Sequence, residues 1–192
     1  MRNEMQFAKG FLPWVAFAGM SAFGWQWASL GALVVSVWIL LIGVKGGFKA
    51  EALVLEYSNT VFFALWTVLA FADPSSPAEH LDGPVSMAWL AATAWGSILV
   101  GHPFTTGIAK RDVPREMWND PGFLRVNLIL TRVWAIAFSI STLTLGLVVV
   151  AHLNVGFRVF FQAAGLIIPA IVTVQYPKRV QARMNATITQ GV

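Results

Sequence analysis

The stretch WQWASLGALVVSVWILLIGV (Trp25–Val44) contains no charged residue and is followed by Lys45. As a helix it would rise about 30 Å at ~1.5 Å per residue, which matches the hydrocarbon core of a bilayer. Its apolar residues form a long run rather than an amphipathic stripe, so lipid is the expected surroundings of its surface. The stretch therefore predicts a transmembrane helix.

Five more apolar segments accompany this one. They span about residues 11–24, 53–72, 85–100, 128–151 and 157–176. The chain is 57% hydrophobic and 11% charged, whereas soluble domains are about 25% charged. The sequence thus predicts an all-α, polytopic integral membrane bundle of six apolar segments, which form one transmembrane domain over residues 1–192.

The segment at 11–24 is the shortest of the six. It would reach only about 21 Å as a helix, so it fits a tilted half-helix, a re-entrant segment or the hydrophobic part of a signal peptide. Pro13, Trp14 and a poor cleavage context argue against a signal peptide. We favour a sixth short helix, because crossing the bilayer keeps Arg2 and Lys9 on the inner side. We expect it to be the most peripheral and least stable helix.

The connections between the segments alternate in charge. The charged residues are Lys45 and Lys49 in one gap, Asp73, Glu79 and Asp82 in the next, Lys110, Arg111, Arg115 and Arg125 in a basic loop at 102–126, and Lys178, Arg179 and Arg183 in a tail at 177–192. Of the 13 Lys and Arg residues, all but Arg158 can be placed on one side of a membrane. This positive-inside pattern predicts that both termini are cytoplasmic. We therefore expect the basic residues to contact the headgroups of membrane lipids. The net charge of +4 does not indicate binding of nucleic acid.

Local signals mark the ends of several helices. Asp120-Pro121 and Asp82-Gly83-Pro84 each read as an N-cap with proline in the first turn. Within the basic loop, Val113 to Trp118 is predicted to be a short interfacial helix.

Polar residues at membrane depth follow stripes on the third, fifth and sixth segments. Glu56, Asn59, Asn127 and Gln162 carry the strongest polar groups in these stripes. They would line a polar cavity between the helices or form hydrogen bonds that hold the helices together. We favour hydrogen bonding, because only Glu56 and Arg132 are ionisable and both lie near cytoplasmic ends. There they would pair with each other or reach headgroups.

The chain offers few groups for catalysis. It has no cysteine, which excludes thiolate nucleophiles, thiolate metal sites and disulfides. His102 has no second histidine on its side of the membrane, and a metal or haem site needs several ligands together. We therefore expect no enzyme activity, no metal and no cofactor. A third possibility is a lipid-modifying enzyme with His102 and Glu56 as its acid-base groups.

Several residues also occur in a recognisable order. They are Phe11-Leu12-Pro13, Lys49 to Leu53, Gly96-Ser97-Ile98-Leu99-Val100-Gly101-His102-Pro103, Trp118, Asn127, Trp134-Ala135-Ile136-Ala137-Phe138, Asn154 and Phe157-Arg158-Val159-Phe160. In this order and spacing the chain resembles the intracellular septation protein A family of bacterial inner-membrane proteins, as a diverged relative. Arg132 stands where the family is expected to carry an apolar residue.

The resemblance implies a non-enzymatic role in cell-envelope maintenance and septation at the bacterial inner membrane. The expected partners are other inner-membrane proteins of division or wall synthesis, and a homo-oligomer is also compatible. The cytoplasmic contact loop would present His102, Arg111, Arg115 and Trp118. The alternative is a small-molecule or ion transporter, or a channel, whose path follows the polar stripes.

Overall fold

The computed structural model describes the backbone of residues 2–190 and the side chains of residues 9–182. The chain is 85% helical, and its described part contains no strand. The α-helices are α1 (Arg2–Met20), α2 (Trp25–Lys45), α3 (Val54–Ala72), α4 (Asp82–Leu99), α5 (Phe104–Ala109), α6 (Pro121–Val150) and α7 (Val155–Gln190). Short 3-10 turns connect them: η1 (Ser21–Phe23), η2 (Ala50–Ala52), η3 (Pro77–Leu81) and η4 (Arg115–Met117).

Four of the described helices are long and apolar enough to cross a membrane. They are α2, α3, α6 and the Val155–Ala182 part of α7. Neither α1 nor α4 is among them. The predicted class, an all-helical protein with several helices of membrane-spanning length, is therefore confirmed, while the number of six spans is not.

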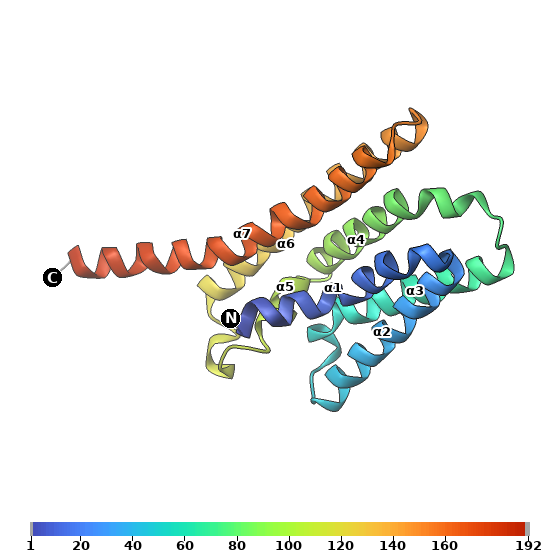
Figure 1. The fold of residues 1–192 in the computed structure, drawn as a ribbon. Coiled ribbons are helices and arrows are strands. Elements are labelled where there is room, and N and C mark those ends of the chain that lie inside the picture. Colours follow the sequence, from blue (N-terminus) through green and yellow to red (C-terminus); the bar gives the residue numbers. More distant parts are fainter. Residues whose placement is uncertain (1, 191–192) are drawn as a thin grey trace.

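The connections between the long helices gather at two ends of the bundle (Figure 1). The chain ends marked N and C, the connection from α2 to α3 and the connections on either side of α5 lie at one end, which we call the basic end. The connections from α1 to α2, α3 to α4 and α6 to α7 lie at the other, the acidic end. Charges that are scattered along the sequence are therefore grouped in space.

Several helix boundaries differ from the predicted segments. Helix α1 begins at Arg2, well before Phe11, and ends at Met20; the turn η1 then leads to Gly24, which has a φ of 99°. Helix α6 begins at Pro121, because the Asp120 side chain accepts a hydrogen bond from the Phe123 amide at 2.7 Å. This N-cap was predicted. Helix α4 begins at Asp82 itself rather than at Val85, so the predicted N-cap at Asp82 is wrong: Leu81 holds that position.

Helix α7 also runs further than predicted. It continues through Pro177 to Gln190, where the sequence suggested a separate tail. The residues after Pro177 include no glycine and several good helix formers, so the helix resumes after the one donor that proline removes. In Figure 1 the C-terminal part of α7 extends beyond the other helices.

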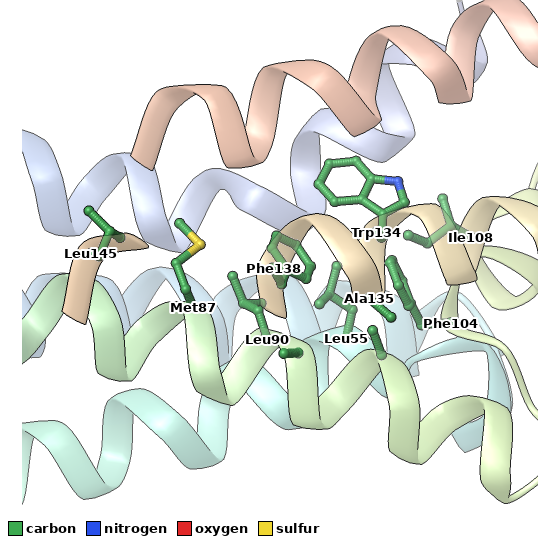
Figure 2. Packing of buried hydrophobic residues seen from close by; sticks show 11 residues of the cluster. Leu55, Met87, Leu90, Phe104, Ile108, Trp134, Ala135, Phe138 and Leu145 are labelled. Atoms are coloured by element: carbon green, nitrogen blue, oxygen red, sulfur yellow. The ribbon is translucent and has the colours of Figure 1, made fainter. Parts of the chain in front are cut away.

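One of two hydrophobic clusters joins α3, α4, α5 and α6 (Figure 2). Trp134 and Phe138 of α6 lie beside Leu90 of α4 and Phe104 of α5. Trp134 also donates a hydrogen bond from Nε1 to Oγ1 of Thr173 on α7 at 2.9 Å. This cluster therefore fixes the short helix α5 against the long ones.

The second cluster joins α2 and α3 and is closed by α1. Trp14 of α1 packs on Phe62 and Phe63, with ring centroids 5.0 and 4.7 Å apart. Phe11 of α1 stacks on Trp134 at 5.0 Å. The expectation that the first segment is the most peripheral is wrong, because its aromatic side chains enter both clusters. Helix α7 is more exposed, with 11% of its apolar window buried.

Candidate functional site

The basic end is built around α5, which lies inside the stretch predicted to be a loop at 102–126. Helix α4 stops because Gly101 adopts a φ of 78°, and its last turn closes with hydrogen bonds from Gly101 to Ile98 and from His102 to Ser97. This is the Schellman pattern that glycine favours. Pro103 then turns the chain, and the Ser97 hydroxyl accepts from the Phe104 amide at 3.2 Å.

The prediction of a loop at 102–126 is therefore wrong for the part that forms α5. Residues 104–108 are all buried, because α5 folds inward and packs in the hydrophobic cluster. The side chain of the predicted contact residue Arg111 is also buried. Further along the stretch, Arg115, Glu116 and Met117 are exposed, and η4 forms a single turn where a short interfacial helix was predicted.

A buried polar contact holds α5 to α6. The Thr105 hydroxyl donates to the Asn127 carbonyl at 2.7 Å and lies 2.7 Å from Oγ1 of Thr131. Since the Thr105 proton is already used, Thr131 is the donor in the second bond. The Asn127 side-chain amide donates to the Phe123 carbonyl of its own helix at 2.9 Å. The side chain of Asn127 therefore bonds within α6, and its backbone carbonyl accepts the bond from α5.

A buried ion pair holds the end of α5 to α3. Nη1 of Arg111 lies 2.8 Å from Oε1 of Glu56, and the two side chains are 7% and 3% exposed. These opposite charges therefore form a buried ion pair. The Arg111 guanidinium also donates to the Ala52 carbonyl and lies 5.5 Å from the Phe48 ring centre. Glu56 therefore pairs with Arg111, and the predicted pairing with Arg132 is wrong.

Helix α5 also touches η2 through its backbone. A Cβ atom on Gly107 would lie 2.9 Å from the Ala52 Cα and the Glu51 carbonyl oxygen. Only glycine leaves room for this approach. The connection that precedes α5 also meets η2 at the surface, through the 3.6 Å contact between Nδ1 of His102 and the Glu51 carboxylate. Both of these side chains are about half exposed, so this pair adds little to stability.

Two cations flank the indole of Trp118 on the outer side of α5. Nζ of Lys110 lies 5.4 Å and the Arg115 guanidinium carbon 5.7 Å from its ring centre. Its Nε1 donates to the Val113 carbonyl at 3.3 Å. We call Lys110, Arg115 and Trp118 the cation–indole cluster. Each cation–π contact of this kind contributes about 0.5–1 kcal/mol at an exposed site.

The four residues of the predicted polar path are not gathered in one place. Asn59 accepts from Nε1 of Trp14 at 3.2 Å and donates to the Gly10 carbonyl at 2.8 Å, so it links α3 to α1. Glu56 faces α5, and Asn127 lies at the start of α6. Gln162 is half-buried on α7 near Gly83, which belongs to the acidic end.

Two shallow hollows stand out over the described side chains, and both lie on α7. One has about 340 Å³ and is lined by residues such as Ile167 and Ile171; the other has about 410 Å³ and is lined by residues such as Phe157 and Phe160. None of the four path residues lines either hollow. Within the described side chains, no three His, Asp or Glu residues come together as metal ligands.

Sequence reasoning named Arg111 and Trp118 but missed their partners. It also missed Thr105 and Gly107 as contact residues, although Gly-His-Pro after an apolar run is a helix-stop signal that would have suggested a turn there. Compared with protein-family models, curated proteins and solved structures, the chain matches none of them.

The ion pair gives a first prediction. Glu56→Leu leaves the Arg111 guanidinium buried without its partner, which should lower the free energy of unfolding by about 3–5 kcal/mol. The double variant Glu56→Leu/Arg111→Met should recover most of this loss. Thermal unfolding of purified protein in detergent measures both, with Glu51→Gln at the exposed pair as a control that stays near wild type. A double variant no more stable than the single one would contradict the pairing.

The close approach of α5 to η2 gives a second prediction. Gly107→Ala places a methyl group against backbone atoms, and overpacking of this kind costs about 1–3 kcal/mol. Gly96→Ala is the matched control, because a methyl group added there meets nothing within 4 Å and alanine favours a helix. Gly107→Ala should lower the unfolding temperature while Gly96→Ala leaves it equal or higher. The reverse order would show that α5 does not touch η2.

Proposed function

We propose that the chain is a six-segment protein of the bacterial cytoplasmic membrane with both termini in the cytoplasm. Helices α1 and α4 run between the same two ends as the four helices of spanning length (Figure 1). The connections with Lys45, Lys49 and Lys110 meet at the basic end, which favours the cytoplasmic side. Arg158, the one cation of the acidic end, contacts Asp82 there at 3.7 Å.

The absence of cysteine gives a direct test of this topology. Lys49, Ser75 and Asn154 are exposed in connections at the two ends. Single Lys49→Cys, Ser75→Cys and Asn154→Cys variants should react differently with a membrane-impermeant maleimide. We expect the Ser75→Cys and Asn154→Cys variants to be labelled in intact cells, and the Lys49→Cys variant only in inverted vesicles. Labelling of all three from one side would disprove the proposed arrangement.

We further infer a non-enzymatic role exerted through other membrane proteins. The observation that carries this inference is the packing of the centre: Trp134, Phe63 and Phe138 are at most 1% exposed. Several of the buried polar side chains are bonded to each other, as in the bonds of Asn59 to Trp14 and of Thr105 to Thr131. A centre filled in this way favours binding at the outer surface over passage of a solute.

The basic end supplies the proposed contact surface. The cation–indole cluster and the neighbouring Met117 are held in place by the turn η4 and by the buried anchor of α5. Tryptophan, arginine and methionine are enriched at protein interfaces. Because this surface is already ordered, binding a partner costs less conformational entropy than folding a loop would.

The partner class rests on the sequence resemblance described above. The order of residues shared with septation proteins supports a role in envelope maintenance, with division or wall-synthesis proteins of the inner membrane as partners. A second copy of the chain is a further candidate partner.

Transport is the second candidate function, and one observation favours it. The hydroxyls of Thr67 and Thr106 are buried without a hydrogen-bond partner. Glu56 and Thr67 lie on α3, where the sequence suggested a polar path. Such groups would suit a small polar solute that passes between helices.

One experiment separates the two functions. A photo-crosslinking amino acid at Met117 should capture inner-membrane proteins in native membranes, whereas the same group at Leu153 should not. These residues are 46% and 45% exposed and lie at opposite ends of the bundle. Failure to capture division or wall-synthesis proteins, together with solute flux in liposomes that Glu56→Gln abolishes, would overturn the binding role in favour of transport.

A further inference from the structure

The outer face of α6 carries a regular apolar stripe. Its exposed residues are Ile136, Ile140, Leu143, Leu147 and Val150, each three or four positions after the last. This spacing keeps them on one face of a helix. The opposite face holds the buried residues Leu130, Trp134, Phe138 and Leu145. The stripe therefore faces away from the bundle, toward lipid.

Two arginines continue the same stripe toward the basic end. Arg132 precedes Ile136 by four residues, and Arg125 precedes Arg132 by seven, which is close to two helical turns. Both side chains are exposed. The chain thus places two cations directly beneath an apolar, lipid-facing surface.

Helix geometry sets the depth of these two cations. From Val133 to Val150 the helix rises about 27 Å at ~1.5 Å per residue, close to the ~30 Å of a hydrocarbon core. Arg132 then lies at the edge of the hydrocarbon. Arg125 lies roughly 10 Å further out, at the level of the headgroups.

Two other arginines, Arg111 and Arg158, have a carboxylate partner within the chain. Arg111 contacts Glu56, and Arg158 contacts Asp82 and the His80 carbonyl. Over the described side chains, the ion pairs do not include Arg125 or Arg132. Arginine side chains at this depth reach the interface, where the phosphates of anionic lipids attract them.

We propose that Arg125 and Arg132 form a binding site for an anionic phospholipid on the outer face of α6. The planar guanidinium matches the oxygens of a phosphate diester with two parallel hydrogen bonds. The acyl chains would lie along Ile136, Ile140 and Leu143. This apolar continuation favours a lipid over a soluble anion, since a free phosphate ion gains nothing from it.

The test compares lipid binding to variants of the full chain purified in detergent. Native mass spectrometry measures retention of phosphatidylglycerol against phosphatidylcholine with the same acyl chains. Each arginine near an anionic surface contributes about five-fold in affinity, so Arg125→Gln/Arg132→Gln should weaken phosphatidylglycerol binding roughly 30-fold. Lys45→Gln/Lys49→Gln removes the same charge from exposed residues of the same end and should change binding by less than about two-fold.

Three outcomes would overturn the proposal. They are no preference of the wild-type chain for phosphatidylglycerol, an equal loss in both double variants, or full displacement of the lipid by inorganic phosphate. Arg125→Lys/Arg132→Lys keeps the charge but not the paired hydrogen bonds, and should retain intermediate binding. If the double glutamine variant fails to fold, the double lysine variant serves as the test. Complete loss of its preference for phosphatidylglycerol would also refute the site.

Discussion

Polar groups inside a bundle of apolar helices must find partners within the chain, because neither lipid nor a packed centre offers them any. This constraint explains which helices are joined. Trp14 and Asn59 link α1 to α3, Trp134 and Thr173 link α6 to α7, and Thr105 with Thr131 links α5 to α6. In each case a polar side chain on an apolar helix selects one neighbour. The hydrophobic clusters pack these helices and also join α2 to α3, which none of these bonds does.

Helix α5 is where the constraint is most demanding. It has only 6 residues, and it lies at the basic end, where charges are concentrated. Besides its packing in the hydrophobic cluster, three other contacts hold it: the Thr105 hydrogen bonds, the backbone approach of Gly107 and the Arg111–Glu56 ion pair. Removing a charge from such a pair costs more than the pair itself contributes. The basic end is therefore rigid inside and charged outside.

The outside of the molecule consequently holds the groups that are available to other molecules. At the basic end, Lys110 and Arg115 flank Trp118, while Arg125 and Arg132 border the lipid-facing stripe of α6. These are two separate surfaces, one turned toward the cytoplasmic side in the proposed topology and one toward the bilayer. In the proposed role, the protein meets its partners at these surfaces.

The amino-acid sequence alone determined the helical class, the long apolar segments and the grouping of charges. These follow from local composition and from periodicity, which do not depend on how the helices meet. It also predicted the cap at Asp120, because a cap involves residues only three apart. The burial of α1 and α5 and the partner of Glu56 were decided by the tertiary structure. Sequence spacing gives the face of a helix on which a residue lies. Which distant segment covers that face depends on the packing of all the helices together, so Arg111 rather than Arg132 neutralises Glu56.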